Sequence, residues 1–337
     1  MNKKTLPLVK PLITCYTPVA ALFSIIGRSS LANPWIYSNY INITGYYFRF
    51  NGAAELAIIP SWHAPKLCPW IVESILSRET CMVFDESIVG FLQKCIDTDY
   101  YVYMVVDESK FNHQKTESYF PHDLFISGYD KAKEIFYVHD FALTDFFTCV
   151  EISFSQIDDA YKNLKPEDDY INEKFGGITL WKYNSKANYD FDSVLVKQTL
   201  QEYILSTNYM ERFRFMRNTH NDRYLNIKHG IGVYEFLKEV IITQPGSIPK
   251  CMNNFYDHKS LMVHRLNYMK NNNLLGNPDA HINNYTKIRD EMKKNSNLAI
   301  KYQFTKDKRL LEKITSSLDQ LKAFEIDTVN TIIRSIE

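Results

Sequence analysis

Three residues in the N-terminal half have the side chains of a cysteine-dependent catalytic site. Cys15 stands at the head of an apolar, helix-like segment, and His122 and Asp140 flank a segment with the pattern of a β-hairpin. A thiolate can attack a carbonyl carbon, an imidazole can accept and return the thiol proton, and a carboxylate can orient the imidazole. These residue types predict nucleophilic catalysis by Cys15, with His122 as base and acid and Asp140 as orienter.

The segment after Cys15 has the pattern of a helix that would favour the thiolate. Apolar residues recur at positions 19, 22, 23 and 26, and Gly27 suits the helix end. At a helix N-terminus the macrodipole and the free N–H groups stabilise a thiolate and can hold a developing oxyanion. No Gln or Asn stands shortly upstream of Cys15. We therefore expect backbone N–H groups to be the oxyanion donors.

The hairpin pattern places His122 and Asp140 on one side of two paired strands. Residues 122, 124 and 126 of one strand and 136, 138 and 140 of the other are even-numbered, and side chains alternate along a strand. A turn centred on Lys131 would set the two residues directly opposite each other, whereas a one-residue change of register would make them diagonal neighbours. In both registers the side chains of His122 and Asp140 can reach each other. Asp123 and His139, the rival carboxylate and base, would point to the opposite face.

Each of these residue types also has a structural interpretation. A free cysteine is commonly a buried core residue, and an aspartate can simply end a strand. Other candidate clusters carry less chemistry. His63 and Cys68 lie near each other but lack further ligands at metal spacing. His258 and His264 fit surface or interface positions. We therefore predict no metal site and no cofactor.

The surrounding patterns predict an α+β protein with two regions. Up to about residue 189, short apolar strands alternate with loops; they include a strand-like run at 35–50, a helix at 69–78 and a strand at 100–106. From residue 190 helical periodicity dominates, and helices are predicted at 192–217, 234–242, 258–270, 282–295 and 307–336. No low-complexity linker separates the regions. We expect a catalytic domain at 1–189 and a helical region at 190–337 that packs on it and shapes the substrate pocket.

Composition narrows the classes of partner and the compartment. The 337 residues contain 39 basic and 39 acidic side chains, so no bulk charge favours nucleic acid or an anionic membrane. Six cysteines without a C-x-x-C pair fit a reducing cytoplasm. Lys3 and Lys4 before the apolar stretch 12–26 resemble a short signal peptide, but Lys10, three prolines and the lack of a cleavage site argue against one. We expect a cytoplasmic protein that binds neither nucleic acid nor a membrane, and its oligomeric state is not predicted.

A longer motif contains the histidine and the aspartate. Asp107 is followed by His122, then by the Gly-Tyr-Asp turn at 128–130, and then by Asp140 at the end of an apolar strand pattern. With the early Cys15, this order resembles the papain-like, C39-peptidase-like group typified by the N-terminal domain of butirosin biosynthesis protein H. The resemblance covers roughly residues 7–165. Thr14 stands where related acyltransferases often have histidine.

The resemblance implies a papain-like cysteine-enzyme fold, in which the nucleophile helix packs on an antiparallel sheet. The type member moves an acyl group from a carrier-protein thioester to an amine of a natural product, through an acyl-cysteine. This implies an acyltransferase of antibiotic or other natural-product biosynthesis with catalytic Cys15, His122 and Asp140. Its partners would be an acyl carrier protein or peptidyl carrier domain and a small-molecule amine acceptor. A cysteine peptidase or amidase with the same triad, and a non-catalytic binding module, are the alternatives.

Overall fold

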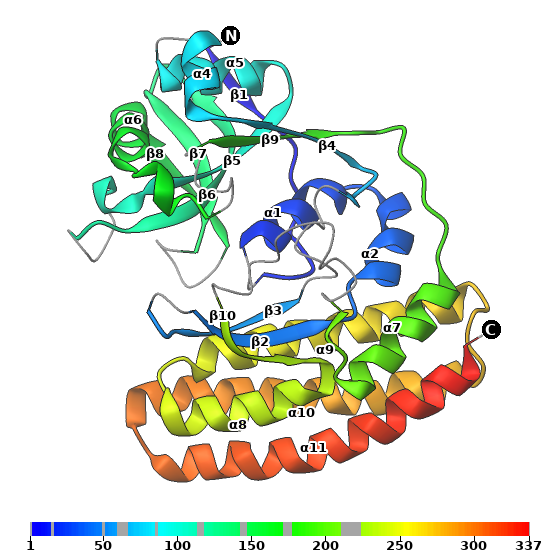
Figure 1. Ribbon diagram of the computed structural model, residues 1–337. Helices are drawn as coiled ribbons and strands as arrows, with labels where there is room; N and C mark the ends of the chain where they lie inside the picture. Colours follow the sequence, from blue (N-terminus) through cyan, green and yellow to red (C-terminus); the bar gives the residue numbers. More distant parts are fainter. Residues whose placement is uncertain are drawn as a thin grey trace. The chain divides into compact units, whose positions relative to one another are not determined.

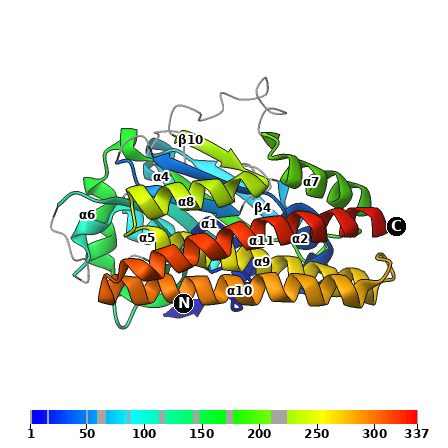
Figure 2. The same cartoon turned by 90° about the horizontal axis from the view of Figure 1, so that it is seen from below.

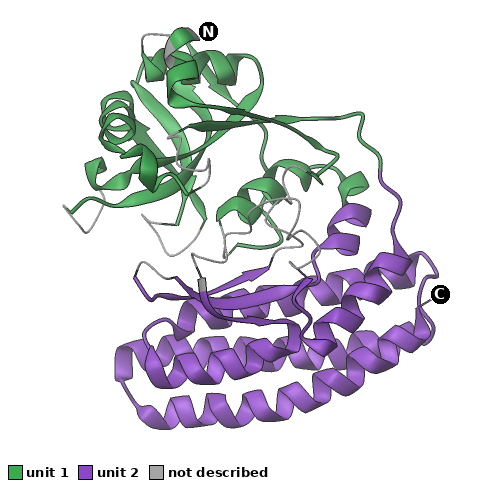
Figure 3. Ribbon diagram, in the orientation of Figure 1, with its two compact units in different colours: residues 1–32, 65–188 green, residues 33–64, 189–337 purple. Residues whose placement is uncertain are grey.

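A computed structural model describes residues 2–14, 17–48, 51–58, 67–84, 87–112, 118–141, 147–170, 177–209 and 224–336. The chain divides into two compact units (Figure 3). Unit 1 comprises residues 1–32 and 65–188, and unit 2 comprises residues 33–64 and 189–337. Each unit combines helices with antiparallel strands (Figure 1). The chain is therefore an α+β protein, with its longest helices in the C-terminal part.

The division differs from the expected one in the segment 33–64. The change of unit at 188/189 lies one residue from the expected boundary, but residues 33–64 group with the C-terminal helices and not with the first region. The reason is strand pairing: β2 (Ile43–Phe48) pairs with β3 (Ala54–Ile58) and with β10 (Tyr224–His229), which is far away in sequence. Unit 2 is therefore not purely helical, because it contains this three-stranded sheet.

Unit 1 is built around one antiparallel sheet. Its described elements, in chain order, are β1 (Lys3–Thr5), α1 (Thr17–Ile26), η1 (Ser30–Ala32), β4 (Ile71–Leu76), α4 (Arg78–Phe84), α5 (Ile88–Asp97), β5 (Tyr100–Asp107), η2 (Glu108–Lys110), β6 (Pro121–Asp130), β7 (Ile135–Asp140), β8 (Thr148–Ser153), α6 (Phe154–Asn163), η3 (Pro166–Asp168) and β9 (Ile178–Tyr183). The strand order is β4-β9-β5-β6-β7-β8, and β1 also pairs with β6.

The central strands β5 and β6 are buried along most of their length. The sequence of β5 is a run of Tyr, Val and Met, the residue types that fit a strand covered on both faces. Helices α5 and α6 both pack against β5, and α1 contacts β6. The predicted helix in the region of α1, the strand at 100–106 and the hairpin are therefore confirmed.

A bulge interrupts β6 between Ile126 and Gly128. Past this bulge, β6 pairs with β1 on the side that β5 occupies before it. A Cβ atom at Gly128 would lie 2.5 Å from the carbonyl oxygen of Lys4 and 2.9 Å from the Cα of Thr5. Glycine is therefore required at position 128 because the two backbones approach closely.

Three local predictions are wrong. The segment predicted as a helix at 69–78 forms the edge strand β4 before α4, because its Ile-Val-Glu-Ser-Ile-Leu sequence pairs with β9. The strand-like run at 35–50 begins instead as α2 (Asn33–Asn39), with β2 only from residue 43. The helix expected over 192–217 ends at Leu205, because Ser206 adopts the left-handed conformation of a C-cap.

Unit 2 contains the long helices. Its further described elements are α7 (Ser193–Leu205), η6 (Gly230–Gly232), α8 (Val233–Thr243), α9 (Ile248–Asn271), α10 (Pro278–Thr305) and α11 (Lys308–Ser335). The last three run side by side, and α10 contacts both α9 and α11 (Figures 1 and 2). Within the part of the chain that the structure describes, no helix has both the length and the apolar character needed to cross a membrane.

A buried carboxylate joins the helices of unit 2. Glu325 on α11 is fully buried, forms an ion pair of 2.8 Å with Lys259 on α9, and accepts a hydrogen bond of 2.6 Å from the hydroxyl of Tyr234 on α8. The hydroxyl groups of Tyr203 on α7 and Tyr285 on α10 donate to the same carboxylate. One side chain thus connects five helices, and because its charge is paired and hydrogen-bonded, its burial is tolerated.

Candidate functional site

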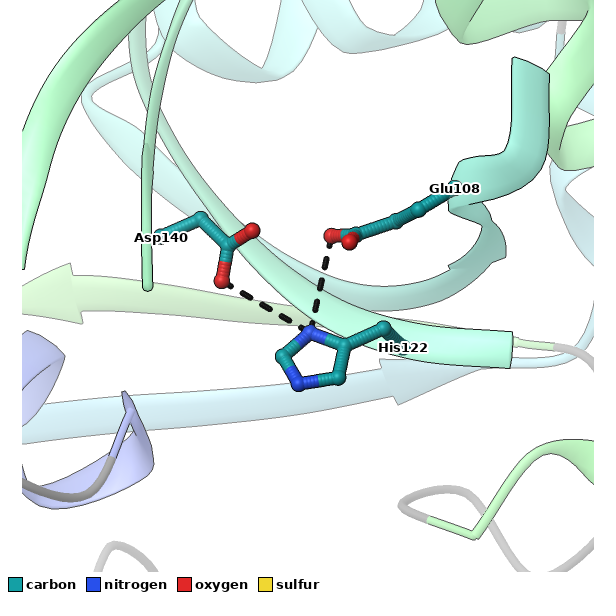
Figure 4. Close-up of side chains that lie close together, drawn as sticks. All are labelled: Glu108, His122 and Asp140. Carbon is teal, nitrogen blue, oxygen red and sulfur yellow. Dashed lines mark ion pairs between the residues drawn. The ribbon is translucent and has the colours of Figure 1, made fainter. Parts of the chain in front are cut away.

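Three neighbouring strands bring His122 between two carboxyl groups (Figure 4). His122 on β6 pairs with Val106 on β5, and Glu108 follows two residues later, directly after the end of β5. On the other side, Phe125 pairs with His139, so Asp140 on β7 is a diagonal neighbour of His122. The directly opposed register is therefore wrong, and the diagonal register is the one observed.

The surroundings of the His122 ring distinguish its two nitrogens. Nδ1 lies 3.5 Å from Oε1 of Glu108, 3.6 Å from Oδ1 of Asp140 and 3.0 Å from the carbonyl oxygen of Asp123. All three neighbours are hydrogen-bond acceptors, so Nδ1 carries a proton. No described residue hydrogen-bonds Nε2. Nε2 is therefore the nitrogen that can take up and return a proton.

Burial and neighbouring charges have opposite effects on the pKa values of the site. The His122 side chain is 28% exposed, whereas those of Glu108 and Asp140 are 0% and 2% exposed. Burial by itself would lower the pKa of His122, but the carboxylates of Glu108, Asp123 and Asp140 outweigh it and raise this pKa to about 10. Burial also raises the pKa of Glu108 to about 8, although the neighbouring His122 opposes it. Because its pKa is about 10, the His122 ring is an imidazolium at neutral pH.

Local contacts fix the position of these groups. The Asp140 carboxylate accepts a hydrogen bond of 2.6 Å from the backbone N–H of Phe141. The Phe120 ring stacks on the His122 ring, with centroids 5.5 Å apart. Asp107, a member of the longer motif, accepts hydrogen bonds from the backbone N–H groups of Ser109 and Phe120. Asp107 thus fastens the backbone that presents Glu108 and Phe120, and does not contact His122 itself.

Cys15 lies outside the residues that the structure describes. The helix α1 begins at Thr17, two residues after Cys15 in sequence, and packs within unit 1 against β6, the strand that carries His122. Four of the other five cysteines, at 68, 81, 95 and 251, are buried, and Cys149 is exposed. Burial raises the pKa of the buried thiols, for example to about 12 for Cys68. The role of Cys15 as nucleophile remains a prediction.

The rival residues have other partners. Asp123 accepts hydrogen bonds of 2.5 Å from the hydroxyl groups of Tyr103 and Tyr170. His139 contacts the hydroxyl of Ser127 at 2.8 Å, and burial lowers its pKa to about 4, so it is neutral at pH 7. These contacts fit the alternation that separates them from His122 and Asp140.

The weaker histidine candidates do not form a second centre among the described residues. His63 lies outside the described residues, and Cys68 is buried. His258 is fully buried, with Nε2 2.7 Å from the carbonyl oxygen of Ile41, so it does not lie at the surface, one of the two positions expected for it. His264 is exposed.

Glu108 is the residue of the site that the sequence interpretation missed. It continues the even-numbered alternation of β5 through residues 102, 104 and 106, and this parity is the signal that could have found it. The residue type alone gives no reason to place it in the site, because a Glu at the end of a strand usually faces solvent. The register of β5 against β6, which no local pattern predicts, brings it to His122.

The same three side chains contain the donor types that a divalent cation binds. Glu108, His122 and Asp140 each offer one ligand atom, and these atoms lie within 4.8 Å of one another. A metal would need the lone pair of Nδ1, but this nitrogen faces the carbonyl oxygen of Asp123 at 3.0 Å and therefore carries a proton. The arrangement fits an imidazolium among carboxyl groups better than a metal centre.

Comparison with known proteins adds no family assignment. No protein-family model matches the chain, and no curated protein matches it.

Proposed function

We propose that the protein is a cysteine-dependent acyltransferase of natural-product biosynthesis, with a papain-like unit 1. In this proposal Cys15 is the nucleophile, His122 the base and acid, and Asp140 the orienter. The observation that supports it best is the His122 ring, whose Nδ1 faces three acceptors while Nε2 has no partner among the described residues. A histidine held in this way can give a proton from Nε2 and then take one back.

The first half-reaction transfers the acyl group to the enzyme. The Cys15 thiolate attacks the carbonyl carbon of a thioester carried by an acyl or peptidyl carrier protein, and the bond between that carbon and the carrier sulfur breaks. Nε2 of the His122 imidazolium gives its proton to the leaving carrier thiol. One thioester replaces another, so this step changes the free energy little.

The second half-reaction forms the amide. An amine acceptor attacks the acyl-cysteine carbonyl, its excess proton moves to Nε2, and Cys15 leaves as a thiolate. Water would give hydrolysis at the same carbon, so the enzyme must admit the amine and exclude water. The protein would act in the cytoplasm, where carrier-bound thioesters are made.

Release of the carrier thiol measures the proposed reaction. With an acyl thioester and a panel of small amines, we expect thiol release to be faster in the presence of the right amine and to yield an amide. Thiol release at the same rate without any amine, yielding the free acid, would identify a hydrolase and contradict transfer.

Replacement of the base provides the matched comparison. His122→Asn should lower thiol release by roughly 10²-fold or more, since general acid–base catalysis contributes about 10²–10⁴-fold. His264→Asn, at an exposed histidine, is the control and should leave the rate unchanged. Equal rates of thiol release for both variants would show that His122 takes no part in the reaction.

A further inference from the structure

Glu108 is a buried acidic residue to which the proposed triad gives no role. Its side chain is fully buried, and Oε1 lies 3.5 Å from Nδ1 of His122. One carboxyl oxygen of Glu108 and one of Asp140 lie within 4.8 Å of each other. Two buried carboxylates at this separation repel each other, so one of them is stable only if it keeps a proton.

Asp140 has an oxygen that needs such a proton. Its Oδ1 accepts from the backbone N–H of Phe141 and faces His122, whereas Oδ2 is buried and has no hydrogen-bond partner among the described residues. In Figure 4 the carboxyl groups of Asp140 and Glu108 point toward each other above the His122 ring. A buried carboxylate oxygen without a donor is unfavourable, and a protonated Glu108 would supply that donor.

We propose that Glu108 is a positioning residue, which donates a hydrogen bond from its protonated carboxyl group to Asp140 and thereby holds Asp140 as the ionised partner of His122. The orienting role of Asp140 belongs to the proposed function, on which this inference rests. The cluster then contains a neutral Glu108, an anionic Asp140 and a cationic His122. Its net charge is zero, as a buried site requires.

The electrostatic surroundings of Glu108 support this assignment. Burial raises the pKa of Glu108, His122 lowers it, and Asp140 raises it further, to about 8. Tyr170, in the segment after η3, donates a hydrogen bond to Asp123 and also interacts electrostatically with Glu108. On α6, which packs against η2, Lys162 pairs with Asp158 at the surface, 2.5 Å apart. The net effect keeps the proton on Glu108 at neutral pH.

The protonation of Glu108 can be measured directly by carbon-13 NMR of the glutamate carboxyl carbons in the full chain. The Glu108 resonance is assigned as the one that Glu108→Gln removes. We expect it to titrate near pH 8, well above the ordinary value of about 4.3 for a glutamate. Titration of Glu108 near 4.3 would overturn the proposal.

Two substitutions separate hydrogen-bond donation from packing. Glu108→Gln keeps a neutral donor of the same shape, and Glu108→Ala removes it. We expect Glu108→Ala to lower thioester turnover at pH 7 by about tenfold or more, as loss of a supporting hydrogen bond does elsewhere, and Glu108→Gln to recover most of that loss. The wild-type rate should change as the pH rises through 8, because Glu108 then loses its proton. Glu108→Gln has no such proton and should not show this change. Equal impairment of both variants would overturn the proposal.

The two proposals fail in different ways. If the protein is not an acyltransferase, no variant turns over a thioester. The carboxyl titration needs no substrate, so it still measures whether Glu108 is protonated. If Glu108→Ala does not fold, Glu108→Gln and the titration decide. The purified protein could instead contain a stoichiometric transition metal that is lost in Glu108→Gln. That result would contradict the assignment of a proton to Glu108 and identify a metal centre. Glu151→Gln is the charge-matched control.

Discussion

His122 can act as a base through only one of its ring nitrogens. The acceptors around Nδ1 keep a proton on it, so any proton exchanged with a substrate must pass through Nε2. Sequence parity predicted the approach of His122 to Asp140. It did not predict the second carboxyl group, because the approach of Glu108 depends on the register of β5 against β6.

The charge on His122 is the first testable consequence. The raised pKa, about 10, means that the imidazolium persists at pH 8, where a histidine with the ordinary pKa of about 6.5 is neutral. Imidazole NMR of the full chain, assigned with His122→Asn, measures this. Asp140→Asn should lower the pKa of His122 by about one unit or more, because it removes a nearby opposite charge.

Glu151→Gln is the control for the loss of one carboxylate at an exposed position of the same sheet, and it should leave the His122 titration unchanged. A titration midpoint of His122 near 6.5 in the wild type would contradict the electrostatic account of the site.

At the scale of elements, the site depends on how β6 is paired. The bulge between Ile126 and Gly128 shifts the register of the hairpin, so that Asp140 becomes a diagonal neighbour of His122. The hairpin could be predicted from its alternation and its turn. The bulge could not, because it lies where the partner of β6 changes from β5 to β1, and β1 is more than a hundred residues away in sequence.

Replacement of the bulge glycine tests that approach. Gly128→Ala would place a Cβ atom 2.5 Å from the carbonyl oxygen of Lys4, so the backbones must separate and β1 should lose part of its pairing. We expect the free energy of unfolding to fall by roughly 1–3 kcal/mol, the usual cost of overpacking. Urea unfolding followed by circular dichroism measures it.

Gly246→Ala is the matched control, since no atom lies within 4 Å of a Cβ atom built there. Its unfolding free energy should change by less than about 0.5 kcal/mol. Equal effects of the two substitutions would show that the close approach of β1 to β6 does not matter for stability.

At the scale of the whole molecule, each unit is assembled from separate stretches of chain. Helical periodicity predicted the C-terminal helices but not their dependence on residues 33–64. Arg265 on α9 is fully buried and donates to the carbonyl oxygens of Tyr37 and Tyr40, and Asn254 donates to Glu55. Such long-range hydrogen bonds leave no periodic signal in a sequence.

A fragment of residues 189–337 should therefore not fold on its own. It would leave β10 without β2, and Arg265 buried without its carbonyl acceptors, which is strongly unfavourable. We expect poor dispersion in its amide NMR spectrum and no cooperative unfolding. A fragment that joins 33–64 to 189–337 through a flexible linker should recover both. Cooperative unfolding of the shorter fragment would contradict the division into these units.

The central claim is that Cys15 carries the acyl group. Intact-mass spectrometry after incubation with a panel of acyl thioesters, without an amine acceptor, tests it most directly, and peptide mapping locates the adduct. We predict one acyl group on Cys15, present in Cys149→Ala, which lacks the exposed thiol, and absent in Cys15→Ala. Absence of any adduct, or an adduct on Cys149 alone, would contradict the claim.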